Sequence, residues 1–329
     1  MKDHLLGFDI GGTKCAVLLG KRSPEGLDIV YRHAFPTETD RGPDAALSRM
    51  ESEAQIGLHD LAIPTDDIGG IGISCGGPLD NRKGVILSPP NLPGWDDVRI
   101  KERFETYFGI PVRLENDADA CAVAEWMWGA GRGCHSMVFL TFGTGMGAGL
   151  ILDGRLYSGA HGLAGEVGHV RLENDGPVGY GKRGSFEGFC SGGGIAQLAA
   201  AVAAEHFARG EEVGFCTPDS DPRKITALAV AEAARRGDKA ALDIFEVVAS
   251  NLGRGLAILA DILDPEMIVI GSIYTRNHDL LWPTANQVLQ LEAIQSKGRE
   301  ILIAPAALGD KVGDYACLAL AAHSEEGLK

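Results

Sequence analysis

The stretch LLGFDIGGTKCAVLLG at residues 5–20 decides the fold. Two apolar runs flank a glycine-rich turn, and this pattern predicts a β-hairpin, because glycine readily takes the positive φ values that tight turns need. The turn itself, DIGGT at 9–13, allows two readings. It is either a plain hairpin turn or an anion-binding loop, in which Gly11 and Gly12 let backbone N–H groups approach a phosphate and Thr13 donates to a phosphate oxygen. It is not a Walker loop, because no GK[ST] follows the glycines.

A second segment, SMVFLTFGTGMGAGLILDGRLY at 136–157, repeats the order of strand, glycine-rich turn and strand. Gly143, Thr144 and Gly145 are placed to cradle another phosphate. The rival interpretation, a dinucleotide fingerprint, is weak because the segment continues as an apolar strand rather than opening a helix. The same device at the start of each half predicts two related α/β units with a nucleotide held between them.

The remaining periodicity predicts an α/β fold of two facing lobes. Residues 1–117 are expected to form a small lobe, joined by a C-terminal helix at about 312–329, and residues 118–311 a large lobe. The segments behind this division are helices at 42–61, 99–109, 118–128, 193–210, 238–263 and 315–329, and strands at 68–74, 110–117 and 267–272.

Composition narrows the classes of function. The formal charge of −15 over 329 residues, without basic blocks, counts against nucleic-acid binding. No apolar run is long enough for a membrane span, and the first residues lack the apolar stretch of a signal peptide. Seven scattered cysteines without a CxxC pair suit reduced thiols. We therefore expect a cytoplasmic protein.

Two polar clusters are candidates for chemistry. In LENDAD at 114–119, Asn116 and Asp117 can bind a sugar diol, with Asp117 accepting a proton from an attacking hydroxyl. The competing interpretation is a helix N-cap, which Asn and Asp both serve well, and we expect Asp119 to be structural. In GEVGHV, Glu166 and His169 are bracketed by glycines, which suits either a loop that lines a polar pocket or an ordinary surface loop.

Taken together and in order, these motifs resemble the ROK family of sugar kinases and repressors, within the actin-like ATPase superfamily. DIGGTK at 9–14 looks like the first phosphate loop, and SCGGPLD to SPPNLPGW at 74–95 resembles the sugar-loop region of bacterial glucokinases. LENDADA is similar to the catalytic-aspartate motif, TFGTGMGAG at 141–149 to the second phosphate loop, GEVGH to the ExGH sugar motif, and DPEMIVIGS to the adenosine-side segment.

The resemblance implies a two-lobed actin-like (ribonuclease H-like) ATPase fold with nucleotide and sugar in the interlobe cleft. It implies ATP and Mg²⁺ as requirements, Asp117 as the catalytic base, and a homodimer. Asp9 would hold Mg²⁺, directly or through water. The implied sugar-binding residues are Gly76, Asn91, Asn116, Asp117, Glu166, His169 and Glu187. The implied nucleotide-binding residues are Asp9, Gly11, Gly12, Thr13, Lys14, Gly143, Thr144, Gly145 and Gly271.

One departure from the family pattern concerns zinc. Members commonly carry CxCGxxGCxE after ExGH, and its cysteines bind a structural zinc together with the ExGH histidine. Here Val178, Tyr180 and Ser185 occupy the cysteine positions. These side chains cannot supply thiolates, so we predict that zinc is absent, that packing holds the loop, and that His169 is left for the sugar alone.

The resemblance implies phosphorylation of a hexose at its primary hydroxyl, with glucose as the first choice. N-acetylmannosamine and N-acetylglucosamine kinases share every motif quoted above and stay open as alternatives. A ROK repressor is disfavoured, because its helix-turn-helix precedes the DxGGT segment and only eight residues precede it here. A catalytically silent sugar sensor is the remaining alternative of another class.

Overall fold

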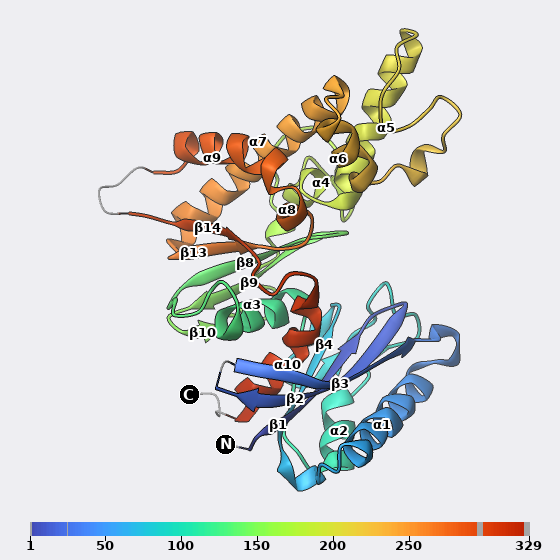
Figure 1. Cartoon of the computed structure of the whole chain (residues 1–329), viewed down its shortest axis with the longest axis vertical. Helices are drawn as coiled ribbons and strands as arrows, with labels where there is room; N and C mark the ends of the chain where they lie inside the picture. Colours follow the sequence, from blue (N-terminus) through green and yellow to red (C-terminus); the bar gives the residue numbers. More distant parts are fainter. Residues whose placement is uncertain (1, 25, 295–298, 326–329) are drawn as a thin grey trace.

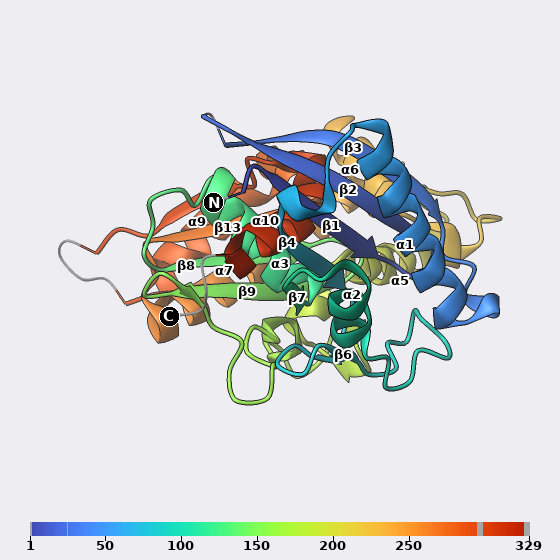
Figure 2. The same cartoon turned by 90° about the horizontal axis from the view of Figure 1, so that it is seen from below.

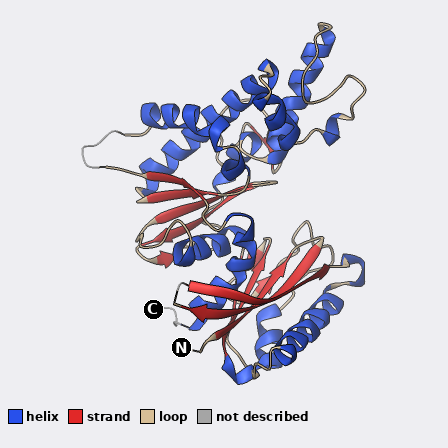
Figure 3. Cartoon of the chain, viewed as in Figure 1, coloured by secondary structure: helices blue, strands red, loops and turns tan. Residues whose placement is uncertain are grey.

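The computed structural model describes residues 2–24, 26–294 and 299–325. Two five-stranded sheets, each with helices packed against it, build two lobes that lie one above the other (Figure 1; Figure 3). The expectation of a two-lobed α/β fold is therefore confirmed.

The first sheet has the strand order β3-β2-β1-β4-β7. The predicted hairpin is present: β1 (His4–Ile10) pairs antiparallel with β2 (Lys14–Ser23), and Ile10 lies opposite Cys15 next to the turn. A third antiparallel strand, β3 (Gly26–Pro36), continues the meander, and the sequence analysis had not predicted it. On the other side of β1, β4 (Ile68–Cys75) and β7 (Val112–Glu115) run parallel to it.

Two helices, α1 (Pro43–Asp60) and α2 (Ile100–Phe108), cover one face of this sheet (Figure 1; Figure 2). The expected end of α2 is observed, since Gly109 caps it with a left-handed φ of 68°. Between β4 and α2, the short strands β5 (Leu79–Asp80) and β6 (Val85–Ile86) pair antiparallel.

The second sheet repeats the first, as the two glycine-rich hairpins predicted. Its order is β10-β9-β8-β13-β14, again three antiparallel strands followed by two parallel ones. The strands are β8 (Met137–Phe142), β9 (Met146–Leu152), β10 (Arg155–Leu156), β13 (Met267–Ile270) and β14 (Leu302–Pro305).

Most of the remaining helices pack on the far side of the second sheet, and the largest hydrophobic core forms there around the long helix α7 (Figure 1). The helices are α4 (Phe186–Phe189), α5 (Gly192–Ala208), α6 (Ala227–Arg235), α7 (Lys239–Leu263), α8 (Ile273–Arg276) and α9 (His278–Glu292). The sequence analysis predicted α5 and α7 and missed α6 and α9. A small hairpin, β11 (Val178–Gly179) with β12 (Lys182–Arg183), precedes α4.

Two helices lie between the sheets: α3 (Asp117–Trp128) packs on β8 and β9, and α10 (Val312–Glu325) packs on β1 and β4 (Figure 1). Glycine makes the close approach of α10 possible, because a Cβ at Gly72 would overlap the carbonyl oxygen of Cys317. The predicted lobe boundary at residue 117 and the assignment of 312–329 to the small lobe stay predictions, and residues 326–329 lie outside the described part of the chain.

Within the described residues all seven cysteines are free, and five of them are buried. Burial raises the pKa of the buried thiols, so they stay protonated and inert. None of the described helices combines the length and the apolar character that a membrane crossing requires.

Candidate active site

A cleft with a volume of about 450 Å³ lies where residues of the two lobes meet. Its lining combines the turn after β4, the start of α3, the turn between β8 and β9, the loop at 162–166 and Glu187 of α4. Of the predicted site residues, those that line it are Gly76, Asn116, Asp117, Gly143, Thr144, Gly145, Glu166 and Glu187. The structure thus brings eight candidates from five separate segments to one cavity.

The junction between β7 and α3 satisfies both interpretations of LENDAD. Asn116 is the N-cap of α3, and its side-chain oxygen accepts from the backbone N–H of Asp119 at 2.9 Å. Its amide also donates to Asp119 Oδ2 at 2.9 Å. Because Asn116 caps the helix, Asp117 is not needed as a cap and presents its carboxylate to the cleft.

Two carboxylates from different elements influence each other at this point. Asp117 is open to the cleft, but the protein around it displaces enough water to raise the pKa of its carboxyl. Asp9, at the end of β1, has a pKa raised to about 7, mainly by burial and then by the negative charge of Asp117. Lys14 partly opposes this shift. Two acidic groups that disfavour each other's charge suit a divalent cation, which would offset the repulsion.

The first glycine-rich loop turns without the positive φ values that the sequence predicted. Neither Gly11 nor Gly12 has a positive φ, so the prediction that the turn needs such angles is wrong. The turn closes instead through the Gly11 N–H, which donates to the Lys14 carbonyl at 3.0 Å. Glycine is required at 12 for space, because a Cβ there would overlap the carbonyl oxygen of Asn91 and lie 2.9 Å from its Cβ.

Asn91 connects this loop to the cleft. A Cβ at Gly76 would lie 3.6 Å from Asn91 Nδ2 and 3.8 Å from Asp117 Oδ2, so the two side chains converge on the same glycine. Asn91 is not itself among the residues that line the cleft, and neither are Asp9, Gly11, Gly12, Thr13 and Lys14. The loop at 9–14 therefore reaches the cleft through Asn91 and Asp117.

The second glycine-rich loop is held by the start of α5 and by Glu187 of α4. The carbonyl of Gly143 accepts from the N–H of Gly192, at the start of α5, at 2.8 Å. Glu187 Oε2 accepts from the Met146 N–H at 3.0 Å, and a Cβ at Gly145 would come within 2.8 Å of the same oxygen. Glu187 therefore combines a predicted sugar-binding carboxylate with a direct bond to the phosphate-side loop.

Gly271 borders this loop from another strand. Its N–H donates to the Leu140 carbonyl at 2.9 Å, which places the end of β13 beside the end of β8. The next residue, Ser272, has a φ of 57°, and a Cβ at Gly143 would lie 3.6 Å from its Oγ. The predicted adenosine-side segment thus adjoins the predicted second phosphate loop.

The two residues of the GEVGH motif separate. Glu166 lines the cleft, whereas His169 does not. The His169 ring lies 6.3 Å from the ring of Tyr180 in an edge-on arrangement, and Tyr180 is 78% exposed. The sugar-binding role of His169 stays a prediction.

Protein contacts hold the loop in which the family's cysteines are replaced. Ser185 is fully buried and caps α4 by accepting from the Gly188 N–H at 3.1 Å. Gln197 of α5 clasps the backbone of Val178: its Oε1 accepts from the N–H and its Nε2 donates to the carbonyl, both at 2.9 Å. Lys182 Nζ donates to the His169 carbonyl at 2.7 Å. No motif pointed to Gln197, because it lies on a helix outside the loop at 178–187.

No group of three or more His, Cys, Asp or Glu side chains in the described part of the chain is arranged to hold a metal ion. We expect a zinc chelator to leave both the unfolding temperature and the KM for sugar unchanged, because no thiolates are available at 178, 180 or 185. Thermal melts and kinetics with and without chelator test this. Activity that is lost to chelator and restored by zinc would contradict it.

Removing the Gln197 side chain, which is hydrogen-bonded to the backbone of Val178, should weaken sugar binding. We expect Gln197→Ala to raise the KM for sugar several-fold and to lower the free energy of unfolding by about 1–2 kcal/mol, since both bonds to Val178 and a longer one to the Gly193 carbonyl are lost. Gln197→Glu is the matched control. It keeps the acceptor oxygen and loses the N–H donor, so its KM for sugar should lie between those of the wild type and Gln197→Ala. Unchanged KM in both variants would show that the clasp does not support the site.

A pH-dependent stability is expected from Asp119, which is only 1% exposed. Burial, and then the charge of Glu115, raise the pKa of its carboxyl from 3.8 to about 8. Because the folded-state pKa exceeds the unfolded value, the stability that Asp119 contributes is complete below pH 3.8 and is lost as the pH rises to 8.

We therefore expect Asp119→Asn to raise the free energy of unfolding at pH 8 by up to about 5 kcal/mol, with the gain shrinking toward pH 4. Asparagine copies the protonated acid and keeps an oxygen for the Asn116 amide. Chemical denaturation at both pH values is the measurement, with Asp119→Ala as a control that loses this bond. A gain that is equal at pH 4 and pH 8 would refute the assignment.

Comparison with known proteins assigns the family. The family model described as "ROK family" matches residues 5–324. The chain belongs to the ROK family. Among its relatives, the glucokinase of Streptomyces coelicolor is 32% identical over 312 residues, which is 94% of each chain. The bifunctional enzyme NanE/NanK of Brucella melitensis is 33% identical over 81% of this chain and 45% of its own length.

A solved ROK structure, the glucokinase of Streptomyces griseus in complex with glucose and AMPPNP, superposes with a TM-score of 0.73. It is 29% identical, and the match covers 97% of this chain and 99% of that one. The expectations of an actin-like two-lobed fold and of an ATP-dependent sugar kinase are confirmed by these ROK relatives.

Proposed function

We propose that glucose is the sugar that this ATP-dependent sugar kinase phosphorylates, and that the acceptor is its primary hydroxyl. The observation that carries the proposal is the position of Asp117. It lines the interlobe cleft together with the glycine-rich loop at 143–145 and the polar side chains of Asn116, Glu166 and Glu187. The names of the similar glucokinases support glucose over other hexoses.

In this proposal the sugar's hydroxyls are bound by Asn91, Asn116, Glu166, His169 and Glu187. Asp117 accepts the proton of the primary hydroxyl as that oxygen attacks the γ-phosphoryl group of ATP. Burial raises the pKa of the Asp117 carboxyl above its usual value, which makes the carboxylate a better base. Closure of the two lobes would exclude water and align the reacting groups.

The phosphates of ATP would lie along backbone N–H groups of the two glycine-rich loops, at 9–14 and 143–145, with Gly271 on the adenosine side. The fit of Mg²⁺ rests on Asp9 and Asp117, whose mutual repulsion a cation would relieve. When bound, Mg²⁺ supplies positive charge to the phosphate oxygens. We further propose that the protein works as a homodimer in the cytoplasm, without nucleic-acid or membrane partners.

The decisive experiment is a coupled assay of ADP release with Mg-ATP and a panel of glucose, mannose, fructose, N-acetylmannosamine and N-acetylglucosamine. Turnover that depends on Asp117 and has its highest kcat/KM for glucose supports the proposal. A higher kcat/KM for an N-acetylhexosamine would replace glucose as the substrate. Sugar binding without turnover of any sugar would show instead a silent sensor.

A further inference from the structure

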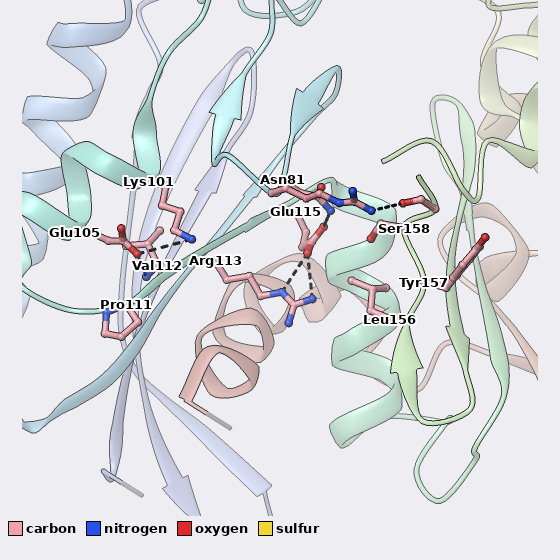
Figure 4. Close-up of a pocket in the computed structure, with 12 residues that line it drawn as sticks. Asn81, Lys101, Glu105, Pro111, Val112, Arg113, Glu115, Leu156, Tyr157 and Ser158 are labelled. Atoms are coloured by element: carbon pink, nitrogen blue, oxygen red, sulfur yellow. Dashed lines mark hydrogen bonds and ion pairs between the residues drawn. The ribbon is translucent and has the colours of Figure 1, made fainter. Parts of the chain in front are cut away.

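A second cavity, with a volume of about 500 Å³, lies between the lobes beside the catalytic cleft (Figure 4). Two loops, one from each lobe, contribute to both spaces. The loop after β4 lines the cleft with residues 77–79 and the second cavity with residues 81–82. The loop after β10 lines the second cavity with residues 158–159 and the cleft with residues 162–163. The two loops therefore border both spaces.

These loops are hydrogen-bonded to each other and to the end of β7, the strand that leads into α3. Arg82 donates from Nη2 to the carbonyl of Gly159 at 3.1 Å, a bond that crosses from one lobe to the other. Asn81 Nδ2 donates to Glu115 Oε2 at 2.8 Å (Figure 4). Glu115 is the last residue of β7 and lies two residues before Asp117. A ligand in the second cavity would touch groups that are bonded directly to the frame of the active site.

The charge of the cavity differs from that of the chain. Although the protein carries a formal charge of −15, cations outnumber carboxylates in this lining, where Arg82, Lys101 and Arg113 stand with Glu105 and Glu115. Lys101 is held only weakly, since its Nζ lies 4.0 Å from Glu105, and the Glu105 carboxylate also accepts from the Val112 N–H at 3.2 Å. Lys101 is therefore available to an anion, and Arg82 uses one of its five N–H donors on the Gly159 carbonyl. Arg113, deeper in the wall, is already paired with Glu115 at 3.1 Å.

The rest of the lining suits a polyol. The cavity is bordered by the amide of Asn81, the hydroxyl of Ser158 and the half-exposed ring of Tyr157 (Figure 4). Sugar hydroxyls pair with amides and hydroxyls, and the C–H faces of a sugar pack on aromatic rings. A volume of about 500 Å³ lies in the range of sites for small organic ligands.

We propose that this cavity binds a hexose phosphate, the chemical class of the enzyme's own product, and that the bound ligand inhibits the kinase. The inference rests on the proposed function for the identity of the ligand. Arg82 and Lys101 bind the phosphate dianion, while Asn81, Ser158 and Tyr157 contact the sugar. A ligand that bridges the two loops holds the lobes at one spacing, whereas turnover requires them to move. By linkage, glucose and hexose phosphate then weaken each other's binding.

Calorimetry with glucose 6-phosphate tests the site. The wild-type protein is first saturated with glucose and AMPPNP so that the catalytic cleft is filled. We expect one further equivalent of glucose 6-phosphate to bind, and Arg82→Gln and Lys101→Gln each to weaken this binding about 10-fold. Lys83→Gln is the matched control, because it removes the same charge from the same turn but Lys83 does not line the cavity. If Lys83→Gln weakened the binding of glucose 6-phosphate equally, the assignment would be overturned, because the effect would be one of surface charge in general.

Kinetics separate the site from ordinary product inhibition. We expect inhibition by glucose 6-phosphate that saturating glucose does not abolish. We expect Lys101→Gln to remove this inhibition while kcat without inhibitor is unchanged, because Lys101 makes no bond between the lobes and is paired only loosely with Glu105. Purely competitive inhibition, equal in both proteins, would overturn the proposal. Inorganic phosphate that binds as tightly as the ester would overturn the sugar part of it. Normal turnover of glucose, without binding of glucose 6-phosphate to the protein saturated with glucose and AMPPNP, would refute the second site but not the proposed function. If no sugar is turned over, the variants still test the site by binding to the ligand-free protein.

Discussion

Asp117→Asn should lose phosphoryl transfer while it keeps the sugar. We expect kcat to fall by about 10²–10⁴-fold or more, because the amide cannot accept the proton of the attacking hydroxyl. The fold should be unaffected, since Asn116 and not Asp117 caps α3. The affinity for glucose should change by only a few-fold, because an amide can still hydrogen-bond to a hydroxyl. Steady-state kinetics and calorimetry with glucose measure the two effects separately.

The matched control for this variant is Asp119→Asn. It makes the same chemical change two residues further along the same helix, but the Asp119 side chain is buried against Asn116 and does not line the cleft. It should keep kcat within a few-fold of wild type at neutral pH. If Asp117→Asn lost sugar binding together with turnover, Asp117 would be a binding residue first and its assignment as the base would be wrong.

Local patterns in the sequence were sufficient to predict the frame of the fold. The alternation of apolar runs and glycine-rich turns predicted both hairpins, and the periodicity over 42–61 predicted α1 (Pro43–Asp60). The edge strand β3 was missed because its side chains alternate between half-buried and exposed, without the apolar run that marked β1 and β4. In α9, Pro283 lies inside the helix and obscures the helical pattern.

Parts of the site could be predicted where the contacts of a motif lie within one short segment. They could not be predicted where segments that are distant in the sequence meet. Asn116 and Asp117 needed only the strand–helix junction to be recognised. At Gly12 the expectation of a positive φ was wrong, because glycine is needed there for space beside the backbone of Asn91, which lies 79 residues further along the chain. Likewise, the motif around Glu187 does not predict that its carboxylate accepts a hydrogen bond from the Met146 N–H. Such contacts depend on tertiary packing rather than on residue type.

Gly12→Ala should therefore disable the site through space rather than through backbone angles. Its methyl group would overlap the carbonyl oxygen of Asn91 and lie 2.9 Å from the Asn91 Cβ, so the loops must move apart. Both a predicted phosphate loop and a predicted sugar-binding residue are displaced. A shift of about 1 Å in such a site can cost about 10²-fold in rate, and we expect kcat/KM to fall by at least about that factor. The overlap should also cost roughly 1–3 kcal/mol in the free energy of unfolding.

Gly313→Ala provides the control, because a Cβ there meets no atom within 4 Å and the same methyl group should change neither activity nor stability appreciably. Asn91→Ala separates the two consequences. It keeps the backbone carbonyl that blocks residue 12 and removes only the side chain, so it should raise the KM for glucose and leave the KM for ATP unchanged. If Gly12→Ala instead raised the KM for glucose alone, the loop at 9–14 would bind the sugar and not the nucleotide. The proposed phosphate site would then consist of the loop at 143–145 alone.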